Sequence, residues 1–155
     1  MAGTEKMIDY PRLIKTLIRH ECNNGIIETK PYIDSVGKLT IGIGRNLTDN
    51  GITEEEALIL CRHDIENACK DIVMLVPNYW MLDSVRQEVL VNMMFNLGFP
   101  VFSRFKLMLQ AVNDKDWHEA SRQMLSSRWA QQVGLRATEL SDAMLSGEFE
   151  KEKGE

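Results

Sequence analysis

Glu21, Asp34 and Thr40 are the residues whose types and spacing could carry out chemistry. Hydrolysis of a glycosidic bond needs one carboxyl group that holds a proton as general acid and a second that stays ionised. A hydroxyl beside the ionised carboxylate can hold a water molecule for attack. Spacing alone leaves a second interpretation open, because the chain has 23 acidic residues. In that interpretation Asp34 only shapes a turn and Glu21 only ends a helix in solvent.

The elements that must position these residues lie in the first third of the chain. Asp9-Tyr10-Pro11 predicts a helix start, with Asp9 as cap, and the apolar stripe that follows predicts a helix to about residue 20 or 21. The helical pattern is lost at 23–25, which reads as a turn. Residues 34–37 predict a second turn and 39–43 alternate as a short strand. We therefore expect a small two- or three-stranded sheet within about 25–47.

The rest of the chain is predicted to be helical. Thr53 and Glu56 form a capping box that opens a long helix to about residue 76, and Ser84 to Gln87 reads as a second capping box. The second box opens an apolar, central helix that Gly98 closes. Further helices are predicted over 103–112, 117–126 and 135–145. The buried sites expected for methionine are Met81, Met93, Met94, Met108, Met124 and Met144.

The predicted fold class is α+β, mostly α. A small N-terminal β lobe and a larger helical lobe at about 53–147 would leave an active-site cleft between them. We expect one domain over 1–149, followed by a charged tail at 150–155.

Composition limits the classes of function. The chain has 155 residues, enough for one domain, and a net charge of −5, which argues against a dedicated nucleic-acid binder. Its three cysteines imply no disulfide framework, and its histidines show no metal-ligand spacing. No apolar run is long enough for a transmembrane helix, and the amphipathic start does not look like a signal peptide.

Three blocks of sequence resemble the phage-type lysozymes, the T-even-phage-like muramidases of glycoside hydrolase family 24. The first is His20-Glu21 followed by 31–47, with its Thr-Ile-Gly-Ile-Gly strand. The second is 92–98, which resembles the family's central helix. The third runs from Phe105 through Trp129 to Arg136-Ala137 and resembles the C-terminal helices. The resemblance covers about Leu13 to Phe149 and implies a lysozyme-like fold.

The resemblance assigns roles to particular residues. It implies that Glu21 is the general acid, Asp34 the second carboxylate and Thr40 the threonine that helps seat the water. It also implies that Arg136 pairs with the catalytic glutamate. Substrate contacts are implied for Asn46, Phe95, Phe105 and Gln123, although Gln123 could equally be a solvated helix position.

One departure from the family pattern lies between the two carboxylates. The family has eight residues there and usually a glycine after the glutamate, whereas twelve residues separate Glu21 from Asp34 and Cys22 follows Glu21. We place the additional residues within 22–29. Glu28 is the alternative acid, although no helix end precedes it. Cys22 could be a redox switch or an idle buried thiol.

The predicted function is that of an endolysin, an inverting muramidase that cleaves the β-1,4 bond between N-acetylmuramic acid and N-acetylglucosamine in peptidoglycan and so lyses the host. No cofactor or metal, nucleic acid or stable membrane insertion is expected. The protein would be a monomer in the host cytoplasm and would depend on a separate holin-like membrane permeabiliser. The alternatives are a non-catalytic peptidoglycan-binding relative and a helical interaction module.

Overall fold

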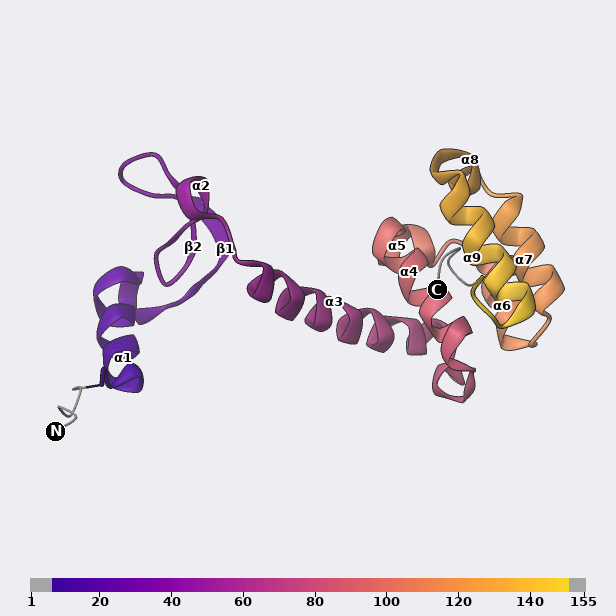
Figure 1. Ribbon diagram of the computed structural model, residues 1–155, viewed down its shortest axis with the longest axis horizontal. Helices are drawn as coiled ribbons and strands as arrows, with labels where there is room; N and C mark the ends of the chain where they lie inside the picture. The colour runs from indigo at the N-terminus through magenta and orange to yellow at the C-terminus, as the bar shows by residue number, and fades with distance from the viewer. Residues whose placement is uncertain (1–6, 151–155) are drawn as a thin grey trace, which may run out of the picture. The chain divides into compact units, whose positions relative to one another are not determined.

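The computed structural model describes residues 7–150 of the chain, and its elements are labelled in Figure 1. It divides into two compact units, Met1–Leu58 and Ile59–Glu155, called unit 1 and unit 2 and described separately. Within the described residues, no helix combines the length and hydrophobicity needed to cross a membrane. Most of the charged tail predicted at 150–155 lies outside the described residues. The single domain over 1–149 stays a prediction.

Unit 1 begins with helix α1, Tyr10–Glu21, as the sequence predicts. The Asp9 carboxylate accepts a hydrogen bond from the backbone N–H of Arg12 at 3.0 Å and so caps the helix. The chain leaves the helix at Cys22, whose backbone is extended. Glu21 therefore stands on the last turn of α1, where the main chain turns toward the sheet.

The sheet of unit 1 is antiparallel and has the strand order β1-β2-β3. A 3₁₀ turn, η1, spans Asn23–Gly25; the strands are β1 Glu28–Ile33, β2 Leu39–Gly42 and β3 Arg45–Asn46. Glu28 lies opposite Gly42, but Tyr32 lies opposite Thr40, so β1 carries two more residues than β2 over that stretch. Strand β1 therefore carries a bulge between Glu28 and Tyr32.

A short helix that the sequence analysis did not predict, α2 Leu47–Asn50, follows β3 directly. The Asn46 side chain caps it by accepting from the Asp49 N–H at 2.9 Å. Helix α3, Glu54–Leu75, comes next and begins in unit 1. Its capping box is confirmed, because the Thr53 hydroxyl accepts from the Glu56 N–H and the Glu56 carboxylate accepts from the Thr53 N–H.

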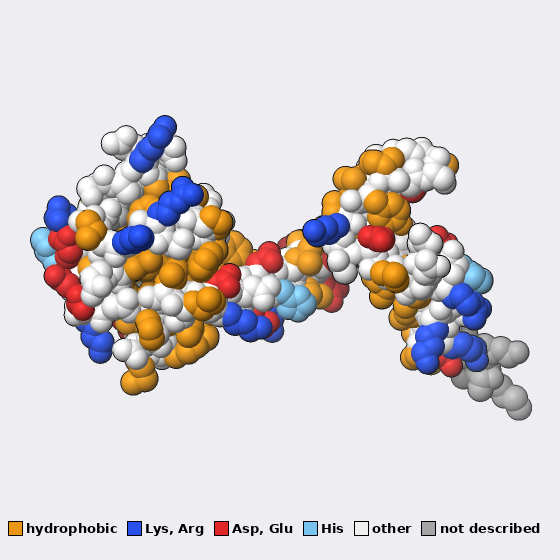
Figure 2. Space-filling model, turned by 180° about the vertical axis from the view of Figure 1, so that it is seen from behind, with side chains coloured by type: hydrophobic (Ala, Val, Ile, Leu, Met, Phe, Trp, Pro, Cys, Tyr) orange, Lys and Arg blue, Asp and Glu red, His pale blue; other side chains and the backbone are white. Residues whose placement is uncertain are grey.

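Unit 2 is helical. Its elements after α3 are η2 Tyr79–Met81, α4 Ser84–Leu97, α5 Phe99–Phe102, α6 Lys106–Asn113, α7 Trp117–Leu125, α8 Arg128–Val133 and α9 Leu135–Ser146. Helix α7 packs against α6 and α9, and α4 packs against α9. Large hydrophobic side chains also reach the surface of this unit (Figure 2), among them Met74 and Trp80.

Two predicted helix starts in unit 2 are wrong. The cap of α4 is Asp83, whose carboxylate accepts from the Arg86 N–H at 3.0 Å, and Gln87 instead donates to the Leu82 carbonyl. Asp83 is therefore the N-cap residue, and Ser84 is the first residue of the helix. The helix predicted over 103–112 begins only at Lys106, because Ser103 ends the separate short helix α5.

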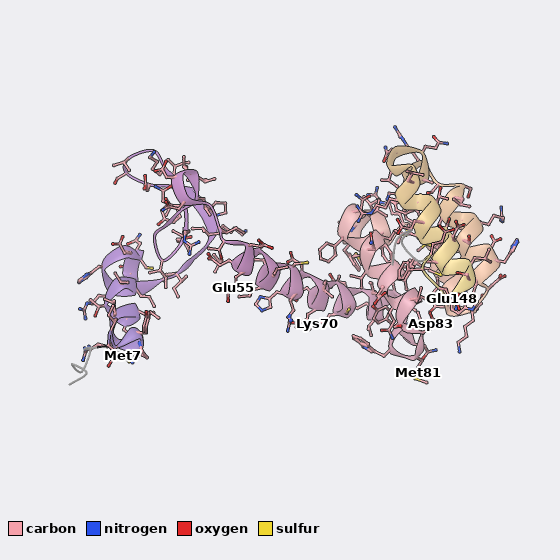
Figure 3. The ribbon with its side chains drawn as sticks, viewed as in Figure 1. Met7, Glu55, Lys70, Met81, Asp83 and Glu148 are labelled. Carbon is pink, nitrogen blue, oxygen red and sulfur yellow. The ribbon has the colours of Figure 1, made fainter. Side chains whose placement is uncertain are left out.

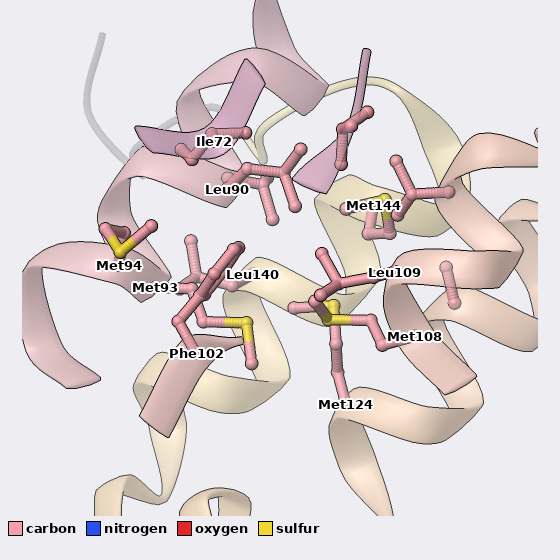
Figure 4. Packing of buried hydrophobic residues seen from close by; sticks show 14 of the residues in the cluster. Ile72, Leu90, Met93, Met94, Phe102, Met108, Leu109, Met124, Leu140 and Met144 are labelled. Carbon is pink, nitrogen blue, oxygen red and sulfur yellow. The ribbon is translucent and has the colours of Figure 1, made fainter. Parts of the chain in front are cut away.

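The core of unit 2 is built around α4, as predicted for a central helix. Val89, Leu90 and Met93 are fully buried, and the side chains that surround them come from several helices (Figure 4). Five of the six methionines expected in the core are buried, but Met81 is 79% exposed because it lies at the end of η2. Phe95, on the outward side of α4, is 44% exposed, so α4 is not buried all round.

Candidate active site

Glu21 brings its carboxyl group to the turn between β2 and β3. A Cβ built on Gly44 would lie 3.5 Å from Glu21 Oε2, so the carboxyl group packs over the bare backbone of this glycine. Gly44 has a positive φ of 77°, a conformation that favours glycine. The end of α1 and the Gly-Ile-Gly turn together fix the position of the expected acid.

Asp34 opens the tight turn between β1 and β2, residues 34–38, which we call the Asp34 turn. Asp34 Oδ1 accepts two backbone hydrogen bonds, from Val36 N–H at 2.9 Å and from Lys38 N–H at 2.8 Å. The Asp34 N–H donates in turn to the Lys38 carbonyl at 2.9 Å. Oδ2 accepts no backbone N–H from residues 7–150 and is the carboxylate oxygen left to act on another group.

Thr40 lies on β2 next to this carboxylate and is 3% exposed. Its Oγ1 lies 3.0 Å from the Lys38 carbonyl oxygen and 3.4 Å from Asp34 Oδ2. A hydroxyl has one proton and two lone pairs, so it donates well to only one of these acceptors at a time. When the proton goes to the nearer Lys38 carbonyl, a lone pair of Oγ1 remains beside Oδ2.

The hydrogen bonds of the turn keep Asp34 ionised. The Lys38 N–H is the largest influence and lowers the pKa of Asp34 below its ordinary value of 3.8; desolvation raises it, and the Val36 N–H and the Thr40 hydroxyl lower it further. Asp34 is therefore ionised at neutral pH. The ionised carboxylate that hydrolysis needs and a hydroxyl that could hold a water beside it are present in one turn and strand of unit 1.

The structure also places Glu28 and Cys22, the two residues for which the sequence left alternative roles open. Glu28, the alternative acid, is an exposed residue of β1 whose Cα pairs with that of Gly42. Cys22 is 7% exposed and carries a free thiol directly after Glu21. Its burial agrees with the idle-thiol interpretation.

The side chain of Asn46 binds Asp49 and is not free to contact a sugar in this conformation. Its Oδ1 accepts from the Asp49 N–H, and its Nδ2 donates to Asp49 Oδ2 at 2.8 Å. Both ends of the side chain are therefore engaged in capping α2. The substrate contact implied by resemblance stays a prediction for this residue, and the structure gives it a local role.

Arg136 and Phe95 line a pocket of about 400 Å³ in unit 2, which also contains Trp80. Asn92 on α4 holds the guanidinium of Arg136, with its Oδ1 at 2.6 Å from Nη2 and 2.9 Å from Nε. This neutral partner orients the arginine without neutralising it. Glu21 belongs to unit 1, so the pairing of Arg136 with Glu21, the expected acid, stays a prediction.

Phe105 and Gln123 line a second pocket of unit 2, of about 330 Å³, together with Arg104 and Lys106. The Phe105 ring meets the Trp129 ring edge to face, with centroids 6.5 Å apart. Gln123 donates through Nε2 to Glu119 at 2.8 Å, which leaves its carbonyl oxygen open. Phe105 and Gln123, two of the four residues implied as substrate contacts, thus line one pocket.

Three contributors to the site were not predicted. Lys38 supplies the backbone N–H and carbonyl that hold Asp34 and Thr40, and Thr48 and Asp49 of α2 bind Leu39 and Lys38. The spacing Asn46-x-x-Asp49, a helix cap followed by an acid three residues on, is the signal that could have found α2. Among residues 7–150, no group of three or more His, Cys, Asp or Glu side chains is arranged to hold a metal ion.

Comparison with known sequences decides the family. The profile of the phage lysozyme family matches residues 24–142, which is most of the chain. The chain belongs to the phage lysozyme family. The match includes Asp34, Thr40 and Arg136 but begins three residues after Glu21, so it does not itself align the acid.

Individual relatives of this phage lysozyme family member come from a phage and from an amoeba. It is 33% identical over 113 residues to the pre-baseplate central spike protein Gp5 of Enterobacteria phage T4, an alignment that covers 70% of this chain and 20% of that protein. It is 30% identical over 145 residues to probable T4-type lysozyme 1 of Dictyostelium discoideum, covering 75% and 85%. For probable T4-type lysozyme 2 the identity is 26% over 151 residues, covering 79% and 89%. The chain therefore spans a fifth of the spike protein and most of each amoebal protein.

Proposed function

We propose that this protein is a muramidase that hydrolyses the β-1,4 bond between N-acetylmuramic acid and N-acetylglucosamine in bacterial peptidoglycan. Membership of the phage lysozyme family supports glycoside hydrolase activity. The single observation that carries the proposal further is the Asp34 carboxylate. Two backbone N–H groups bind its Oδ1, and the Thr40 hydroxyl lies beside its Oδ2.

Glu21 acts as the general acid in this proposal. Its carboxyl group donates a proton to the glycosidic oxygen as the bond to the leaving sugar breaks, which leaves Glu21 as carboxylate. The position over Gly44 supports the role, because the glycine leaves room for a substrate atom near Oε2. Arg136 would pair with the resulting carboxylate.

Asp34 and Thr40 hold the attacking water. The Thr40 proton goes to the Lys38 carbonyl, the water donates one hydrogen to Thr40 Oγ1 and the other to Asp34 Oδ2, and a lone pair of the water oxygen faces the anomeric carbon. Asp34 then accepts the proton that the water loses as it bonds to the sugar. The water's oxygen ends on the sugar, and its two hydrogens are divided between the new hydroxyl and Asp34.

A water held between Asp34 and Thr40 would attack the sugar directly, without a glycosyl-enzyme intermediate, and so would invert the anomeric centre. Asp34 stands at the turn before β2, and Glu21 contacts the turn after it. The four-residue strand β2 therefore lies between the positions of the two carboxyl groups in the chain order of the sheet. Inverting enzymes need about 6.5–9.5 Å between their carboxyl groups to admit a water, whereas retaining enzymes need about 5–5.5 Å.

The finer biological role is proposed with the activity. Phe95, Phe105 and Gln123 would contact the glycan or its peptide, since they line the two hollows of unit 2. The protein would act as a monomeric endolysin that lyses the host, working from the host cytoplasm after a separate holin-like permeabiliser breaches the membrane.

The alternative is a relative that binds peptidoglycan without cleaving it. Two observations support this alternative: twelve residues separate Glu21 from Asp34, and the family match begins only at Asn24. Incubation with purified peptidoglycan separates the two functions. Clearing of the suspension supports the muramidase, whereas co-sedimentation without clearing or release of reducing ends supports the binder and refutes the enzyme.

A further inference from the structure

Two side chains of α2, Thr48 and Asp49, bind the residues at the end of the Asp34 turn. The Leu39 N–H donates to Thr48 Oγ1 at 2.8 Å, and Lys38 Nζ donates to Asp49 Oδ1 at 3.0 Å. These contacts join residues nine and eleven positions apart. Neither contact takes part in the hydrolysis described above, so they call for an explanation of their own.

Lys38 has a fixed backbone and a movable charge. Its N–H is bound to Asp34 Oδ1, and its carbonyl oxygen accepts from the Asp34 N–H and the Thr40 hydroxyl. Its ammonium, in contrast, ends a flexible four-carbon stem and carries three donors. Asp34 lies close enough for the charge of Lys38 to contribute, as the smallest cause, to the lowered pKa of Asp34.

Asp49 is itself held in place to receive that ammonium. Its N–H donates to Asn46 Oδ1 and its Oδ2 accepts from Asn46 Nδ2, which leaves Oδ1 for Lys38. The side chains of Lys38 and Asp49 are 37% and 50% exposed. An ion pair of this kind adds little to folding stability, so a contribution to stability does not account for the arrangement.

We propose that Asp49 is a positioning residue that holds the Lys38 ammonium away from Asp34, keeping Oδ2 of Asp34 open for the attacking water. The proposal rests on the proposed muramidase function for its catalytic meaning. Without Asp49, the ammonium would pair with Oδ2, the oxygen that no backbone N–H occupies, and would compete with the water. The Lys38 ammonium would then occupy the position beside Oδ2 that the attacking water needs.

Two substitutions and their combination test this. Asp49→Asn frees the ammonium and should lower kcat on purified peptidoglycan about three- to fivefold, the effect of one surface ion pair, with KM nearly unchanged. Adding Lys38→Met, which removes the ammonium and keeps the length of the stem, should reverse most of that loss. Glu55→Gln is the matched control, because Glu55 is an exposed carboxylate on the first turn of α3 (Figure 3) and its loss changes the net charge equally.

A second measurement does not depend on activity. Titration of the Asp34 side-chain carboxyl carbon by NMR should show a lower midpoint in Asp49→Asn than in the wild type, and the midpoint should rise again in the double variant. Unchanged kcat and midpoint in Asp49→Asn would overturn the proposal, as would a loss that Lys38→Met does not reverse. If the wild type does not cleave peptidoglycan yet the midpoints move as expected, the proposed function fails while the placement of Lys38 by Asp49 stands.

Discussion

Replacing Thr40 with valine removes one hydroxyl from a buried side chain and keeps its shape nearly intact. The change deletes the donor to the Lys38 carbonyl, but that oxygen still accepts from the Asp34 N–H, so no buried polar group is left without a partner. The cost in folding free energy should be about 1 kcal/mol, the net value of one hydrogen bond. For a chain of this length, that lowers Tm by about 2–4 °C.

The effect on catalysis should be much larger than the effect on stability. Thr40→Val leaves the water with one of its two partners, and loss of correctly placed acid–base catalysis costs at least about a hundredfold in kcat. That factor corresponds to about 2.7 kcal/mol of barrier, well above the stability change. Asp34 should stay ionised, because the Lys38 and Val36 N–H groups lower its pKa independently of Thr40.

Initial rates of reducing-end release across pH, with a parallel thermal melt, provide the assay. Thr40→Ser is the control, since it keeps the hydroxyl and should retain activity to within about tenfold while losing only the methyl group. Thr40→Val with near wild-type kcat would refute the water-holding role. An acid limb of the pH profile that moves upward, with full activity recovered at higher pH, would show instead that Thr40 acts by keeping Asp34 ionised.

Three further predictions concern the fold. Gly147→Ala should destabilise unit 2 by about 1–2 kcal/mol, because alanine is strained in the left-handed backbone of this position. The destabilisation should exceed that range, because the new methyl would lie 3.0 Å from Arg86 Nη1. If the additional loss of stability persists in the Arg86→Met background, the contact with Arg86 is not its cause. Hydrogen bonds from Arg122, the largest cause, and from Gln123 lower the pKa of Glu119 to about 2. The ion pair with Arg122 therefore stabilises the fold above the ordinary glutamate pKa of 4.5 and loses that contribution as pH falls toward 2. The Tm difference between wild type and Arg122→Gln should shrink over that range, and a constant difference would count against it. Dithiothreitol should leave activity and Tm unchanged, since the cysteines are free thiols, and a large shift in either would point to a disulfide.

Local sequence signals predicted the elements whose hydrogen bonds are local. The Asp9 cap of α1 and the Thr53–Glu56 box of α3 join residues three apart, so the pattern and the structure coincide. The pattern Ser84 to Gln87 predicts Ser84 as the cap of α4, whereas the Asp83 carboxylate accepts the Arg86 N–H and caps the helix instead. Such a choice between adjacent capping residues depends on the approach of the chain.

The residues of the candidate site also fall into those that the sequence could identify and those that it could not. Asp34 and Thr40 could be identified from residue type, spacing and resemblance, whereas Lys38 and Asp49 could not. Their contact depends on the β2–β3 turn and on α2, which bring residues eleven positions apart together. The bulge of β1 likewise needs the register of the sheet, because the sequence shows only that additional residues are present.

The identity of the general acid is the central claim of this account, and activity of matched amide variants tests it most directly. Glu21→Gln and Glu28→Gln each remove one exposed carboxylate at nearly constant shape, and the initial rate of peptidoglycan cleavage is measured for both beside the wild type. Glu21→Gln should lose at least about two orders of magnitude in rate, because the amide cannot donate the proton, while Glu28→Gln should cleave at close to the wild-type rate. Full activity in Glu21→Gln, or the collapse of activity in Glu28→Gln instead, would contradict the assignment.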